Sequence, residues 1–200
     1  MQRDHGFSML ELLVVVLIIG LIAAFALPQA LTAVKAYRLH SDAAAFAAQL
    51  NVARFRATSQ NTPYRITIST SVVPHTFQLE RLCGGTPASS DSNCTSAYAP
   101  RTSGVEGGIL PISRGNSFTT TNPGGTTAYP GTITGGTAAT VFHFNTRGMP
   151  VDSNGNPLSN GGAVTYVTNN SNLTDAVAVT VGGRASIYQW KPSDSTWMSR

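Results

Sequence analysis

The feature that most constrains this chain is a long apolar run close to its N-terminus. Between Leu12 and Leu27 every residue is apolar or glycine. Counted from Phe7, the stretch to Leu27 is 21 residues, or about 31 Å as an α-helix, which matches a bilayer core. Arg3 precedes the run, so the positive-inside tendency keeps that end in the cytoplasm. The sequence therefore predicts one membrane-spanning helix.

Two simpler interpretations of this segment are open. One is a secretory signal peptide, because Ala24-Phe25-Ala26 resembles its small-residue cleavage site. The apolar run, however, is longer than the roughly 7–15 residues of such a peptide, and a signal peptide gains nothing from the carboxylate of Glu11. The other is a plain membrane anchor, which explains the length of the run but not Glu11.

Glu11 lies at the start of the apolar stretch, where a charge is costly. A carboxylate at the centre of a membrane helix costs on the order of 3 kcal/mol, and less near the interface. If the chain is cut after Gly6, Phe7 supplies a free amine one helical turn away, and the helix dipole also favours an anion there. In a bundle of staggered copies, the amine of one subunit would neutralise Glu11 of another. The alternative is that Glu11 reaches the lipid headgroups.

The segment Gly6-Phe7-Ser8-Met9-Leu10-Glu11-Leu12-Leu13 closely resembles the prepilin signature shared by type IV pilins and type II secretion pseudopilins. The resemblance implies that a membrane aspartyl peptidase, the prepilin peptidase, cuts after Gly6 and N-methylates Phe7. It implies that Glu11 acts in assembly and that Pro28 kinks the helix. The implied partners are other pilin or pseudopilin subunits, an inner-membrane assembly platform and membrane lipid.

The pattern of residues changes along the chain and defines four segments. They are a leader peptide at 1–6, the transmembrane and assembly half of a long helix at 7–28, its amphipathic half at 29–61, and a periplasmic β-rich domain at 62–200. Apolar residues keep helical spacing as far as Phe55, and Asn61-Thr62-Pro63 ends the helix. The predicted fold class is therefore α+β, with the long helix packed on an antiparallel sheet.

Strands are predicted where apolar and polar residues alternate beyond residue 62. These segments are 64–68, 77–79, 105–112, 140–145, 163–168, 176–181 and 184–190. Gly182-Gly183 predicts a hairpin between the last two. Residues 84–104 and 113–138, rich in Gly, Ser, Thr and Pro, are predicted to be long loops.

The two cysteines, Cys83 and Cys94, lie in a Gly/Ser/Thr-rich stretch. A disulfide between them would stabilise the fold by about 3 kcal/mol and would need an oxidising compartment such as the periplasm. Two free thiols are the alternative. Since no second Cys/His pair has the spacing of a metal site, neither a metal nor another cofactor is predicted.

The second half of the chain resembles the H-type pseudopilin and FimT-like minor pilin branch. The matching segments are 53–63, the strand and turn from Phe142 to Gly148, and 177–184. Some FimT-like proteins bind DNA through a Gly-Arg-x-Arg motif, whereas Gly183-Arg184-Ala185-Ser186 lacks the second arginine. The resemblance makes Arg184, together with Lys191 and Arg200, a candidate DNA-contacting patch. An ordinary hairpin turn with solvated charges is the alternative.

Charge does not decide between these interpretations. Charged residues make up 11% of the chain, below the roughly 25% of soluble domains, and the net charge is +4. This excess permits binding to nucleic acid or anionic lipid without requiring it.

The sequence offers no catalytic constellation. Its four histidines are scattered, and it lacks a nucleophile elbow, a phosphate-binding loop and a zinc-protease helix. Asp152-Ser153-Asn154-Gly155-Asn156 resembles the start of a calcium loop, but Pro157 and Ala163 stand where Gly and Glu are required, so a turn is predicted.

We therefore expect a structural subunit and not an enzyme: a minor pilin or pseudopilin of a type II secretion pseudopilus or type IV pilus. It would be anchored in the bacterial inner membrane by a single pass, with its C-terminal domain in the periplasm. A DNA-binding minor pilin used in DNA uptake is the alternative, and a membrane-anchored periplasmic enzyme is a third possibility.

Overall fold

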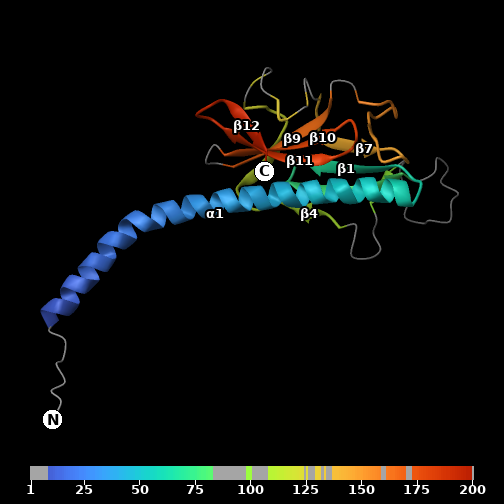
Figure 1. Cartoon of the computed structure of the whole chain (residues 1–200). Coiled ribbons are helices and arrows are strands. Elements are labelled where there is room, and N and C mark those ends of the chain that lie inside the picture. The colour runs from blue at the N-terminus through green and yellow to red at the C-terminus, as the bar shows by residue number, and fades with distance from the viewer. Residues whose placement is uncertain are drawn as a thin grey trace, which may run out of the picture. The chain divides into compact units, whose positions relative to one another are not determined.

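The computed structural model describes residues 9–82, 98–100, 108–123, 125, 129–131, 133, 137–158, 161–169 and 173–199 (Figure 1). Within these residues one helix is followed by twelve strands. The chain divides into two compact units, Met1–Tyr37 and Arg38–Arg200. A long apolar N-terminal helix and mainly antiparallel sheets confirm the predicted α+β class.

Helix α1 spans Met9–Ser59. In the second unit its buried positions recur every three or four residues, which is the spacing of one helix face. They are Leu39, Ala43, Phe46, Ala47, Leu50, Ala53, Arg56 and Ala57. Small alanines alternate with large side chains along this face, so the helix lies close to the strands (cyan part of α1 in Figure 1).

The end of α1 follows from its last residues. Asn61 adopts a left-handed conformation with φ of 48°, which asparagine tolerates better than most residues. The chain reversal lets the Thr62 N–H donate to the carbonyl of Ala57 at 3.2 Å, which satisfies one of the free carbonyls at the helix end. Pro63 then prevents further helix, as predicted.

The first sheet has the order β3-β2-β1-β7-β8, with β4 also paired to β2. Its strands are β1 Tyr64–Ser69, β2 Thr76–Leu82, β3 Tyr98–Pro100, β4 Leu110–Pro111, β7 Val141–Phe144 and β8 Pro150–Val151. The alternating burial of β1 matches its alternating sequence, because one face packs on the core and the other faces outward.

The second sheet has the order β12-β11-β10-β9-β5, with the short β6 pairing β9 in parallel. Its strands are β5 Asn116–Thr119, β6 Thr137–Ala138, β9 Gly162–Asn169, β10 Thr174–Thr180, β11 Ala185–Lys191 and β12 Thr196–Ser199. Strands β9 and β10 are buried on both faces, which explains their nearly continuous apolar sequences.

The main core lies between the second half of α1 and the two sheets. Phe46 is fully buried at its centre and makes edge-to-face contacts with three rings, at centroid distances of 5.2 to 5.6 Å. These rings are Phe77 from β2, Phe118 from β5 and Phe142 from β7. One helical side chain thus ties both sheets to α1.

A smaller core covers the other face of the second sheet. Ile133 packs there against Val164, Tyr166, Ala176 and Ala178. Ile133 itself comes from the segment between β5 and β6 and lies over that face of the sheet.

Most of the strand predictions are confirmed. The segments at 64–68, 77–79, 140–145 and 163–168 contain strands, and β10 pairs antiparallel with β11 as the predicted hairpin. The predictions of loops throughout 84–104 and 113–138 are wrong, because β3 lies in the first and β5 and β6 lie in the second. Strands β5 and β6 are missed because their pairing with β9 is long-range and their sequences are short and rich in Thr and Ser. Strand β12 pairs with the neighbouring β11 and is missed because it is four residues long and mostly exposed.

Candidate functional site

The first described part of α1 exposes a continuous apolar surface. From Met9 to Leu27 its large apolar side chains keep between 46% and 89% of their surface accessible. The helix has the length and composition to cross a membrane, and no residue of its most apolar window is buried within the chain. Leaving one such side chain in water costs about 1.5–3 kcal/mol relative to burying it. Lipid or another protein must therefore cover this surface.

Glu11 lies in the first turn of α1 and is exposed, between Leu10 and Leu12. The unpaired amides at the start of a helix favour a negative charge at this position. Gly6 and Phe7, the predicted cleavage and methylation sites, lie outside the described residues. The pairing of Glu11 with a neighbouring amine therefore stays a prediction.

Pro28 lies inside α1, and the helix continues past it to Ser59. Proline removes one backbone hydrogen bond, so the predicted kink has a physical cause; the kink itself stays a prediction. The exposed apolar surface extends beyond this proline, since Leu31, Val34 and Tyr37 keep 61%, 46% and 75% of their surface accessible.

Two acidic side chains fasten the second half of α1 to the sheets. Asp42 accepts hydrogen bonds from the Ser113 N–H at 2.9 Å, the Ser113 hydroxyl at 3.0 Å and the Asn116 amide at 2.6 Å. Two residues earlier, His40 Nδ1 lies 3.1 Å from the carboxylate of Asp175, which is buried in β10. The hydrogen bonds of Asp42 and of His40 could not be predicted from the sequence, because their partners are 71 to 135 residues away.

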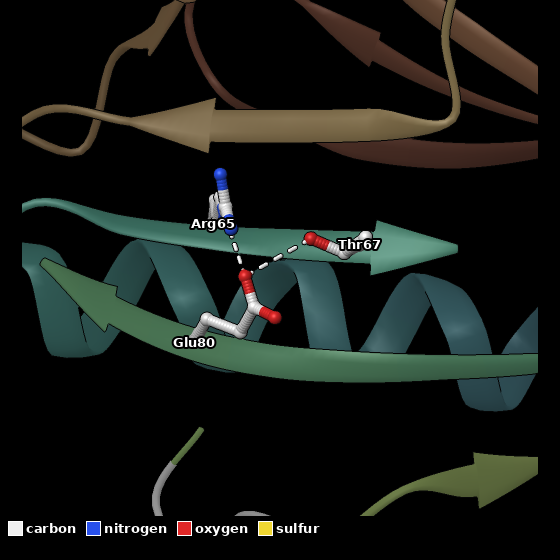
Figure 2. A network of polar contacts seen from close by, with 3 residues as sticks. All are labelled: Arg65, Thr67 and Glu80. Carbon is white, nitrogen blue, oxygen red and sulfur yellow. Dashed lines mark hydrogen bonds and ion pairs between the residues drawn. The ribbon is translucent and has the colours of Figure 1, made fainter. Parts of the chain in front are cut away.

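The outward face of the first sheet carries a small polar network (Figure 2). Glu80 on β2 accepts hydrogen bonds from Arg65 Nε and from the Thr67 hydroxyl, at 3.1 Å for the latter, both on β1. Arg65 is also the cross-strand partner of His143 on β7. The network therefore places a positive charge beside an imidazole.

The pKa of His143 is lowered from its usual value, chiefly because burial disfavours the charged ring and secondly because Arg65 is near. The negative charges of Asp152 and Glu80 act in the opposite direction and do not reverse the shift.

The segment from Asp152 to Asn156 forms a turn, as predicted. Asp152 Oδ1 accepts hydrogen bonds from the backbone N–H groups of Asn154 at 2.9 Å and Asn156 at 2.8 Å. These bonds hold the pKa of Asp152 below its ordinary value. Within the described ranges, His, Cys, Asp and Glu form no group of three that could hold a metal ion.

The structure does not bring the predicted basic residues together. Arg184 is exposed in the turn before β11, whereas Lys191 ends that strand, roughly 23 Å away at 3.3 Å per residue. Lys191 forms an ion pair with Asp194 instead. Arg200 lies outside the described residues, as do Cys83 and Cys94, so the disulfide stays a prediction.

A different set of arginines gathers where α1 ends. The turn after β7 and the turn between β10 and β11 meet there, because a Cβ placed at Gly183 would lie 2.5 Å from the Gly148 backbone oxygen. The same Cβ would lie 3.0 Å from Nε of Arg54. Both glycines have positive φ, of 73° at Gly148 and 80° at Gly183, which permits this close approach.

Arg147 and Arg184 are exposed and adjoin these two glycines in sequence, so their backbones lie near Arg54. Within the part of the chain that the structure describes, no ion pair involves Arg54, Arg147 or Arg184. Of these three arginines, only Arg184 belonged to the patch predicted from the sequence, where it was grouped with Lys191 and Arg200. Gly148 and Gly183 were the sequence signals that could have placed Arg54 and Arg147 near it.

Comparison with known proteins bears on the N-terminal segment. Residues 1–27 match the prokaryotic N-terminal methylation motif. No curated protein and no solved structure matches the chain. The motif covers Glu11 and the apolar run, and it implies processing by a prepilin peptidase and contact with other pilins. Together with the exposed apolar half of α1 and the α+β fold, the motif supports a type IV pilin-like protein anchored in a membrane.

Proposed function

We propose that this chain is an H-type or FimT-like minor subunit of a type II secretion pseudopilus or a type IV pilus. One observation carries the proposal: a helix with an exposed apolar surface carries an acid, Glu11, in its first turn, inside a match to the methylation motif. The role is structural and not enzymatic. The subunit waits in the inner membrane with its β-rich domain in the periplasm.

Assembly would replace lipid by protein around the same surface. Lipid covers residues 9–27 before assembly, and the equivalent helices of sister subunits cover them afterwards. Within such a bundle, Glu11 would be removed from water, and an unpaired carboxylate there would be costly. The N-terminal amine of a neighbouring subunit, created by cleavage after Gly6, offsets that cost. Recruitment would therefore depend on both processing and Glu11.

The mass of the mature chain tests the processing step. Protein extracted from membranes should begin at an N-methylated Phe7, having lost residues 1–6. A Gly6→Leu variant should keep its leader, because the peptidase cuts after the glycine. A wild-type chain that retains Met1 through Gly6, or starts elsewhere, would overturn the proposal.

Removal of the Glu11 charge tests the assembly step. Glu11→Gln should insert into the membrane normally and should be depleted from sheared or cross-linked fibres, because its partner amine loses its counter-charge. Ser8→Ala changes the same turn of the helix without changing charge, and it should assemble as the wild type does. Equal recovery of Glu11→Gln and wild type in the fibre fraction would refute the pairing.

A DNA-binding minor pilin is the second candidate function. The arginines at positions 54, 147 and 184 favour it, since their backbones lie near one another at the end of α1. Such a group can neutralise backbone phosphates, and its affinity would fall steeply with salt. These arginines come from three elements of the fold, and they take the place of the patch of Arg184, Lys191 and Arg200 predicted from the sequence.

Binding of the full-length chain in nanodiscs to a labelled DNA duplex tests this candidate. Arg147→Gln and Arg184→Gln should each weaken binding, and each should reduce the salt slope by about 1. Lys191→Gln is the matched control, because Lys191 is paired with Asp194 at the far end of β11. If all three variants bind alike, or the wild type does not bind at low salt, this candidate fails.

A further inference from the structure

A small cleft opens between the two sheets beside β5 and β9. Its volume is about 220 Å³. Phe118 and five threonines line it: Thr70, Thr119, Thr120, Thr140 and Thr165. Nothing in the fibre proposal uses this cleft.

The cleft exists because two short strands share one edge of β9. Strand β6 pairs with Ala163 and Val164, and β5 pairs from Tyr166 to Asn169. Thr165 lies in the gap between these two pairings. Strand pairing along this edge of β9 is therefore interrupted at Thr165, which carries a hydroxyl group.

The floor of the cleft is buried and its rim is accessible. Thr165 keeps 1% of its surface exposed and Phe118 keeps 4%. The Thr165 hydroxyl is buried and has no hydrogen-bond partner among the described residues. A buried hydroxyl without a hydrogen-bond partner is unfavourable. Because Thr165 lines the cleft, a ligand bound there could supply the missing partner. Thr70, Thr120 and Thr140 are exposed at the rim.

The lining determines what chemistry can be bound. Every threonine hydroxyl can both donate and accept a hydrogen bond. The Thr119 hydroxyl already accepts from the Thr121 N–H at 3.1 Å, so its proton remains free to donate. The described lining contains no ionisable side chain, and a charged ligand would enter without a counter-charge. The ligand should therefore be neutral and carry several hydroxyls.

The volume of the cleft narrows the class of ligand further. The cleft has the volume of about seven water molecules and is smaller than the roughly 300–1,000 Å³ of drug-sized pockets. We propose that this cleft binds a single neutral sugar ring, whose hydroxyls contact the threonines. Such a ring can be a free sugar or the end of an envelope glycan.

Saturation-transfer NMR on the full-length chain in nanodiscs tests the proposal. The probes are methyl α-D-glucopyranoside and methyl β-D-galactopyranoside as free sugars, and N-acetylglucosamine disaccharide as a glycan end. Thr165→Val keeps the shape of the side chain and removes its hydroxyl. It should weaken binding about three- to tenfold, the effect of one hydrogen bond, without lowering the thermal midpoint. Thr196→Val on exposed β12 is the control and should bind as the wild type does.

Saturation transfer to any of the probes that is reduced in Thr165→Val and retained in Thr196→Val supports the proposal. A response to the disaccharide alone would assign the cleft to glycan ends. The proposal is overturned if no probe responds above the signal of empty nanodiscs, or if both variants respond equally. This readout needs neither leader cleavage nor fibres, so its failure is separate from failure of the proposed function.

Discussion

At the scale of single residues, Asp42 shows how one side chain holds a helix on a sheet. Its carboxylate accepts three hydrogen bonds from Ser113 and Asn116, and Asn116 is buried. Asp42→Ala should lower the free energy of unfolding by about 2–3 kcal/mol, because it leaves those donors without a partner. Denaturant unfolding followed by fluorescence of Trp190, which is buried in the same unit, measures the change.

Ser41→Ala is the matched control for Asp42→Ala. Ser41 is the exposed neighbour on the same helix, so its substitution should change stability by less than about 0.5 kcal/mol. Equal stability of the Asp42 and Ser41 variants would show that the three hydrogen bonds contribute nothing net.

His143 should make stability depend on pH. Its pKa in the folded chain is below the ordinary value of 6.5, mainly through burial. As the pH falls, the unfolded chain therefore takes up this proton first. The contribution of His143 to stability is complete above 6.5 and is lost as the pH falls through the lower folded pKa.

His143→Gln removes this proton uptake. The loss of unfolding free energy between pH 7.5 and pH 5 should be smaller in the variant than in the wild type, and both are measured by denaturant titration. NMR titration of the His143 ring gives the folded pKa directly. A ring that titrates at or above 6.5, or an unchanged pH dependence in the variant, would contradict the prediction.

At the scale of elements, α1 is one helix with two kinds of surroundings. Phe46 and Phe55 lie on the same helix, yet Phe46 is fully buried among three rings and Phe55 keeps 71% of its surface exposed. Phe46→Ala should therefore cost about 3–5 kcal/mol through lost burial and the cavity it leaves. Thermal or chemical unfolding of the full chain measures this loss.

Phe55→Ala makes the same chemical change on the same helix. It should alter stability by less than about 0.5 kcal/mol, because an exposed ring contributes little to the fold. A large loss in this control would mean that the face of α1 carrying Phe55 is covered within the chain. Comparable losses in both variants would refute the assignment of the core face.

At the scale of the whole molecule, the unit Arg38–Arg200 has its own core. A fragment that begins at Arg38 should fold alone and stay monomeric without detergent, since the exposed apolar part of α1 is gone. Its thermal midpoint should match that of the full chain within about 3 °C, which corresponds to roughly 1 kcal/mol at this size. Aggregation or a clearly lower midpoint would show that residues 9–37 contribute to the fold.

The N-terminal part of the molecule was predictable because its signals are local. The apolar run, Glu11 and the glycine before Phe7 lie within about six helical turns of one another. Glycines also predicted the β10–β11 hairpin. Helical spacing predicted one apolar face of α1 but placed it wrongly: Phe55, on the predicted stripe, is exposed, and the buried face runs beside it through Phe46 and Leu50. These inferences use neighbours in sequence, for which period and turn chemistry are sufficient.

By itself, the sequence determined a helix that needs an apolar environment and a β-rich domain behind it. Only the tertiary structure decided which side chains meet: Asp42 with Ser113 and Asn116, Arg54 with the turns that carry Arg147 and Arg184, and the threonine cleft where two strands share β9. The physical reason is that such contacts form between residues tens of positions apart. Their formation depends on strand order and register, and no local pattern in the chain specifies these.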